Sequence, residues 1–182
     1  LLLLLFWSLS MTRLLKLREG NSTLNYALLG LYLGLAFLAK YAAVYFFISL
    51  LLLILADKKT LSIFKQNFFK SFVFFLTFFV VLLPNIYWNL NNDWITLSHT
   101  SSNANLQNLN LNLFEPLKFI LAQILMIGPI LVFSFIIFYK FFYLDFVNKF
   151  LLIFSIPIIL IVLIESFLVR ANANWAAPAL IS

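Results

Sequence analysis

The residues that could do chemistry are few, because most of this sequence is apolar. Lys40 has apolar residues on both sides, and the polar interval at residues 85–112 holds Asp93, Trp94 and His99, the sole histidine. A charge at membrane depth is costly and usually faces a cavity or a partner. Lys40 is therefore predicted to bind an anion such as a phosphate, as a point charge. The alternative is a lysine that reaches from a helix end to the membrane surface.

The other polar positions each allow two interpretations. His99 either contacts a ligand or is a solvated loop histidine, and with Asp93 alone it lacks the spacing of a metal site. Trp94 either stacks on a sugar or anchors the chain at the membrane interface, and the residues alone favour the anchor. Asn174 and Trp175 lie in a compact polar segment, which could serve only to satisfy backbone groups in a turn within the membrane.

Composition sets the class of protein. The chain is 64% hydrophobic and 10% charged, with a mean hydropathy of +1.06, whereas soluble domains are about 45–50% apolar and about 25% charged. An all-α, polytopic transmembrane helical bundle is predicted. Its net charge of +6 is interpreted as a topology signal and not as a nucleic-acid surface. The absence of cysteine excludes disulfides and thiolate metal sites.

Hydropathy predicts the elements that must position these residues. The apolar run at residues 24–56 would be roughly 50 Å long as one helix, well beyond the ~30 Å hydrocarbon core, so it is split at Lys40-Tyr41. Since the chain begins in the leucine run from Leu1 and stops at Ser182 within an apolar run, it is expected to be truncated at both ends. The predicted helices are residues 1–12, 24–39, 42–56, 67–88, 114–138, 149–168 and 176–182, with an outer loop at 89–113.

The charges agree with this arrangement. Most of the twelve Lys and Arg residues fall on one side of the membrane, which the positive-inside rule makes cytoplasmic, and the polar loop then lies outside. The predicted inner residues are Arg13, Lys16, Arg18, Lys58, Lys59, Lys65, Lys70, Lys140 and Lys149, and the outer ones are Lys40, Lys118 and Arg170.

Three segments resemble one family in the family's own order. Residues 34–41 read GLAFLAKY, residues 83–100 read LPNIYWNLNNDWITLSHT, and residues 170–179 read RANANWAAPA. They are similar to segments of bacterial membrane glycosyltransferases related to protein O-mannosyltransferases and the lipid A aminoarabinose transferase, the family 39-like group. Each segment alone is a weak signal, whereas the ordered set is more specific.

The resemblance implies a GT-C fold and transfer of a sugar from a polyprenyl-phosphate donor to a lipid or protein acceptor at the extracytoplasmic face. The catalytic carboxylate of such enzymes stands in the first outer loop, so it is expected upstream of Leu1, and this middle part of an enzyme should be inactive alone. Lys40 is the first candidate to neutralise the leaving phosphate and Arg170 the second. The implied substrate- and phosphate-binding residues are Lys40, Tyr41, Asp93, Trp94, His99, Arg170, Asn174 and Trp175.

The partners implied are the lipid-linked donor, the acceptor and membrane lipids, with no nucleic acid, and the location is multi-pass in the bacterial inner membrane. The residues supply no metal-ligand set, and participation of a divalent metal stays open. Two other functions are kept: a fragment of a transporter or lipid flippase, where broken helices with an intramembrane lysine also occur, and a non-catalytic membrane scaffold.

Overall fold

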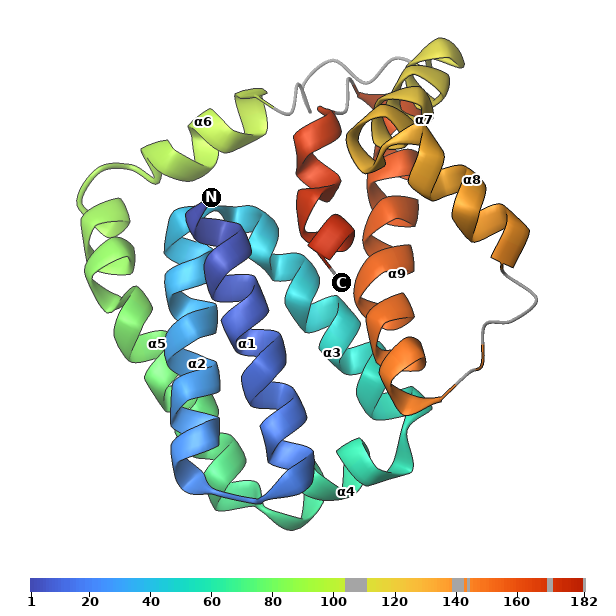
Figure 1. Ribbon diagram of the computed structural model, residues 1–182. Helices are drawn as coiled ribbons and strands as arrows, with labels where there is room; N and C mark the ends of the chain where they lie inside the picture. The colour runs from blue at the N-terminus through green and yellow to red at the C-terminus, as the bar shows by residue number, and fades with distance from the viewer. Residues whose placement is uncertain (104–110, 139–142, 144, 170–171, 182) are drawn as a thin grey trace. The chain divides into compact units, whose positions relative to one another are not determined.

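The computed structural model describes residues 1–103, 111–138, 143, 145–169 and 172–181 (Figure 1). Throughout this described part the regular structure is helical, which confirms the predicted all-α class. The chain divides into two compact units, essentially Leu1–Trp94 and Ile95–Leu180.

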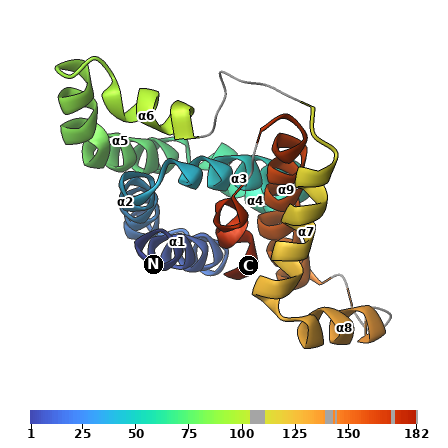
Figure 2. The ribbon, with the colours of Figure 1, turned by 90° about the horizontal axis from the view of Figure 1, so that it is seen from above.

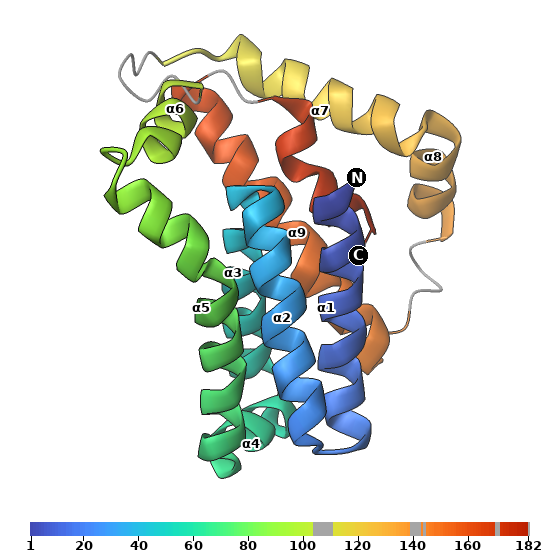
Figure 3. The same cartoon turned by 90° about the vertical axis from the view of Figure 1, so that its left-hand side faces the viewer.

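The first unit is a bundle whose chain runs back and forth. Its helices are α1 (Leu2–Glu19), α2 (Thr23–Ala39), the short 3-10 helix η1 (Tyr41–Ala43), α3 (Val44–Ala56), α4 (Lys58–Gln66) and α5 (Phe68–Leu90). Helices α1 and α3 run in one direction while α2 and α5 run in the other (Figures 1 and 3). Seen from above, α2 lies between α1 and α5, and it packs on both (Figure 2).

Helices α2 and α5 approach closely because α2 carries glycine where they cross. A Cβ added at Gly30 would lie 2.0 Å from Thr77 Oγ1 and 2.3 Å from the carbonyl oxygen of Phe74, and one at Gly34 would lie 2.9 Å from Val81 Cβ. Glycines four residues apart let membrane helices bring their backbones together. Because the higher-numbered glycine faces the higher-numbered partner, the two helices are parallel.

Aromatic rings join α3 to the other helices of this unit. The ring of Trp7 in α1 meets that of Phe46 edge-on, with centroids 5.1 Å apart, and Phe47 meets Phe78 of α5 at the same distance. Trp7 and Phe46 are fully buried. Edge-to-face pairs of this kind add stability beyond the burial of their area, so they fix α3 against α1 and α5.

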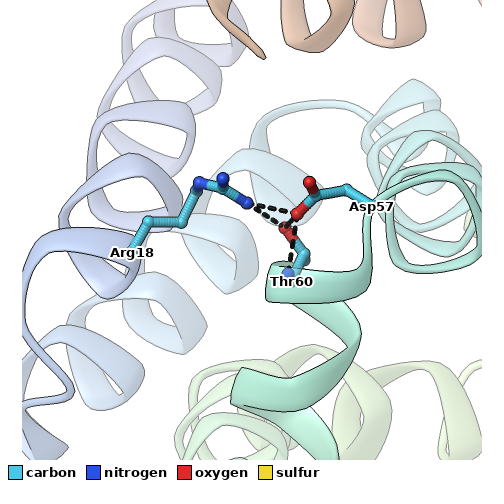
Figure 4. Close-up of polar contacts among 3 residues, drawn as sticks. All are labelled: Arg18, Asp57 and Thr60. Carbon is cyan, nitrogen blue, oxygen red and sulfur yellow. Dashed lines mark hydrogen bonds and ion pairs between the residues drawn. The ribbon is translucent and has the colours of Figure 1, made fainter.

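One end of the first unit, called the basic end, is closed by polar contacts between α1, α4 and their neighbours. Arg18 pairs with Asp57 and donates to Thr60 Oγ1 at 2.9 Å, and Thr60 donates to Asp57 Oδ2 from both its backbone N and its Oγ1 at 2.7 Å (Figure 4). Lys70 Nζ donates to the backbone oxygen of Asn21 at 2.6 Å. These contacts join segments that are far apart in the sequence.

Acid is expected to weaken the basic end. Burial raises the pKa of Asp57, but the hydrogen bonds from Thr60 and the charge of Arg18 outweigh it, so the pKa lies below its ordinary value. The stability that this carboxylate contributes is present above its unfolded-state pKa of about 3.9 and is lost as pH falls through the lower folded pKa. Asp57→Asn should cost roughly 1–3 kcal/mol at neutral pH and remove this acid-sensitive step, as measured by thermal unfolding in detergent from neutral pH to pH 3.

A matched control separates the ion pair from the helix cap. Asp145 also caps a helix, accepting from the backbone N of Asn148 at 2.8 Å. Asparagine is about as good a cap as aspartate, so Asp145→Asn should change stability little. Equal losses for both substitutions would contradict a stabilising role for the Arg18–Asp57 pair.

The second unit contains a broken helix. Its elements are α6 (Ile95–Asn103), α7 (Phe114–Ile127), α8 (Pro129–Phe138), α9 (Phe146–Leu168) and the 3-10 helix η3 (Ala173–Ile181). Helix α8 turns by 90° from α7 at Gly128, whose φ of +96° favours glycine. The backbone N of Asn112 donates to the oxygen of Phe167 at 3.0 Å, which joins the segment before α7 to the end of α9.

The structure has helices suited to crossing a membrane. Helices α5 and α9 are long and apolar enough to span, and the bent pairs Tyr41–Ala56 with Lys58–Gln66 and Phe114–Ile127 with Pro129–Phe138 raise the number to four if each pair is one span. Helix α2 is shorter but apolar. This is the architecture of a helical membrane protein.

Several elements differ from the sequence-based expectation. Helix α1 continues past residue 12 to Glu19, because Arg13 stacks over Tyr32 and Arg18 finds a carboxylate partner. Helix α6 lies inside the expected outer loop 89–113, with hydroxyl groups bonded back to the carbonyls one turn earlier. The remaining differences are the separate helix α4, the break of the expected helix 114–138 at Gly128, and the start of η3 at Ala173 in place of a helix at 176–182.

Candidate functional site

Lys40 lies at the break between α2 and η1. Its backbone is extended, with φ −166° and ψ 132°, and its N still donates to the oxygen of Ala36 at 3.0 Å. The side chain is half-buried. The ring of Tyr41, the next residue, packs edge-on against Phe37 with centroids 5.3 Å apart. The break therefore holds a cation at the end of an apolar helix, with an aromatic ring fixed beside it.

Asp93 and Trp94 form the end of a tight turn after α5. Both have left-handed backbone, with φ of 48° and 54°, and the N of Trp94 donates to the oxygen of Asn89 at 3.0 Å. Left-handed backbone costs a bulky residue about 1–2 kcal/mol. Such strain is often found at binding sites. Buried Asn89 supports the turn, because its amide donates to the oxygen of Asn85 at 2.9 Å.

Parallel packing brings these two features to one end of the first unit. Lys40 follows Gly34 within two helical turns, and the turn at residues 91–94 closes α5 beyond Val81. The end that carries Lys40, Tyr41, Asp93 and Trp94 is called the turn end, and it lies opposite the basic end (Figure 3). Asp93 and Trp94 are exposed there.

The other predicted residues belong to the second unit. His99 is exposed on α6, Asn174 is exposed on η3, and Trp175 is half-buried, with its N donating to the oxygen of Asn172 at 3.0 Å. Arg170 lies outside the described residues. Among the described residues, no group of three His, Cys, Asp or Glu side chains is placed to hold a metal ion.

Gln123 is a polar residue that the sequence analysis did not select. Its Nε2 donates to the backbone oxygen of Ala173 at 3.0 Å, which fixes the start of η3 next to Asn174. The side chain is buried, and its Oε1 has no partner among the residues that the structure describes. The sequence does carry a signal for it, an amide side chain within the apolar stretch 114–127. Polar groups inside membrane helices are often functional.

The fold and these sites define a polytopic helical membrane protein with polar groups at the ends of apolar helices. Residues 1–88 match the family described as dolichyl-phosphate-mannose-protein mannosyltransferase. The whole chain is 30% identical, over 188 residues, to the lipid A galacturonosyltransferase RgtD of Rhizobium johnstonii. It spans 38% of that relative's length. No solved structure matches.

Together these matches support a GT-C glycosyltransferase-like protein, as the three ordered segments predicted. The family match covers α1, α2, α3, α4 and most of α5, including the break at Lys40. The match to the relative also includes the turn at residues 91–94 and the whole second unit. The roles of the individual site residues stay predictions.

Proposed function

We propose that this chain is part of a glycosyltransferase that moves a sugar from a polyprenyl-phosphate donor to an acceptor at the extracytoplasmic face of the bacterial inner membrane. The observation that carries the proposal is the match over the full length of the chain to a lipid A galacturonosyltransferase. That relative's name favours a lipid acceptor over a protein. The basic end then faces the cytoplasm and the turn end faces outward.

The turn end supplies groups that suit a lipid-linked sugar. In the transfer, the acceptor hydroxyl attacks the anomeric carbon, the bond from this carbon to the phosphate oxygen breaks, and the lipid phosphate leaves with the electron pair. Lys40 would stabilise that phosphate as its charge develops. Trp94 offers an exposed ring on which a sugar can stack, and the Asp93 carboxylate can accept hydrogen bonds from sugar hydroxyls.

The other proposed substrate-binding residues come from the second unit, and the proposed catalytic base comes from the rest of the enzyme. His99, Asn174 and Trp175 would contact the sugar or the phosphate, with Arg170 as a second cation. The base that takes the acceptor proton is proposed to be a carboxylate in an outer loop upstream of Leu1 in the whole protein.

A donor assay on the whole protein tests the proposal. The enzyme in detergent is offered a lipid A acceptor with either polyprenyl-phosphate sugars or the matching nucleotide sugars, and the products are identified by mass spectrometry. Transfer is expected from the lipid-phosphate donors alone, because the proposed phosphate site lies at a membrane-embedded helix end. Transfer from nucleotide sugars alone would contradict the proposal. If no transfer occurs, and the protein reconstituted into vesicles moves lipids across their membrane, the flippase alternative is favoured.

A further inference from the structure

Helix α4 lies across the basic end and does not continue α3. Its axis turns by 106° from α3 at Asp57, so with α3 along the bundle it runs nearly in the plane of a membrane surface. Its inner face is fixed to α2 and α5: the hydroxyl of Tyr26 donates to the oxygen of Ile63 at 3.1 Å, and Ser71 Oγ donates to the oxygen of Phe64 at the same distance. Thr60 is buried on this face.

The outer face of α4 is cationic. Lys58, Lys59 and Lys65 are exposed, and exposed Leu61 lies between Lys58 and Lys65 on the same side of the helix. In the described part of the chain these lysines have no carboxylate partner. The other basic side chains at this end are Arg13, Lys16, Arg18 and Lys70, and the acids there are Glu19 and Asp57, of which Asp57 is engaged by Arg18. The end therefore carries an excess of positive charge.

Apolar side chains flank this cationic face. Phe68 and Phe69, the first two residues of α5, are 81% and 74% exposed. Interfacial helices combine a Lys- or Arg-rich face with apolar side chains that enter the acyl boundary, and they are attracted to anionic lipids. Here the lysines come from α4 and the apolar side chains from the start of α5.

We propose that α4 is an interfacial helix that binds the phosphate headgroups of anionic phospholipids through Lys58, Lys59 and Lys65, with Phe68 and Phe69 seated among the acyl chains. The site is distinct from the turn end, and it does not depend on the glycosyltransferase activity. The bound lipid would hold α4 against the bundle and fix the depth of α5 in the membrane.

Native mass spectrometry of the full chain in neutral detergent tests this binding, with phosphatidylglycerol and phosphatidylcholine as the lipids titrated. Phosphatidylglycerol should bind more tightly. A lysine near an anionic surface contributes about fivefold, so Lys58→Gln/Lys59→Gln/Lys65→Gln should weaken phosphatidylglycerol binding by about a hundredfold and leave phosphatidylcholine binding unchanged. Replacing the same lysines with arginine should preserve the binding.

Lys118→Gln is the control for loss of a lysine elsewhere, because Lys118 already pairs with Glu115 and its loss should not matter. Added salt should weaken phosphatidylglycerol binding to the unaltered chain, which tests the proposal even where the triple variant does not fold. Equal binding of the two lipids, or full binding by a folded triple-glutamine variant, would overturn it.

Discussion

Replacing Lys40 with glutamine in the whole enzyme is expected to lower the rate of sugar transfer by about a hundredfold, the usual effect of removing one group that stabilises developing charge. The leaving phosphate gains charge as the sugar bond breaks, and Lys40 stands at a helix break in apolar surroundings, where an ammonium acts strongly. Part of the loss should appear as weaker donor binding, because the phosphate is already charged in the bound donor. Initial rates across a range of donor concentrations separate the two effects.

Two variants show whether charge at this position matters. Lys40→Arg keeps the cation and should retain most of the activity. Lys118→Gln removes an exposed lysine that already has a carboxylate partner, Glu115, and should leave transfer unchanged. If Lys40→Gln transfers sugar as fast as the unaltered enzyme, the phosphate role is wrong and Lys40 is a lysine that reaches to the membrane surface.

Hydropathy was enough to place the long apolar helices. The structure breaks the run at residues 24–56 at Lys40 and η1, and α5 and α9 lie where long apolar stretches stand in the sequence. These features depend on local composition and on the thickness of a bilayer, both of which can be evaluated from the sequence alone.

The features that escaped sequence analysis depend on distant partners. Arg18 meets Asp57 only because α1 and α3 end at the same end of the bundle, and the tight crossing at Gly30 requires Thr77 opposite it. Helix α4 was missed because its charged outer face makes its average hydropathy low even though its inner face is buried. The candidate site shows the same limit: residues 40–41 and 93–94 were chosen one by one, and parallel packing of α2 and α5 puts them at one end.

Substituting alanine for Gly30 is expected to destabilise the first unit by about 1–3 kcal/mol, as overpacking of a tight contact does. The new Cβ would lie 2.0 Å from Thr77 Oγ1 and 2.3 Å from the carbonyl oxygen of Phe74, so α2 and α5 must separate. Alanine's higher helix propensity opposes the loss by at most about 1 kcal/mol. Thermal unfolding in detergent should show the melting temperature several degrees lower, at about 2–4 °C per kcal/mol.

Alanine substitutions at two other glycines should lower the stability less. Gly34→Ala should cost less, since its Cβ would meet Val81 at 2.9 Å, and Gly20→Ala should cost little, since nothing lies within 4 Å of the added atom. Thr77→Ala should rescue Gly30→Ala only in part, because the clash with the Phe74 carbonyl remains. Equal melting temperatures for Gly30→Ala and Gly20→Ala would contradict the close crossing. Since this crossing sets the register of α2 against α5, a loss of transfer activity in Gly30→Ala with Lys40 intact would tie the alignment of the turn end to the chemistry.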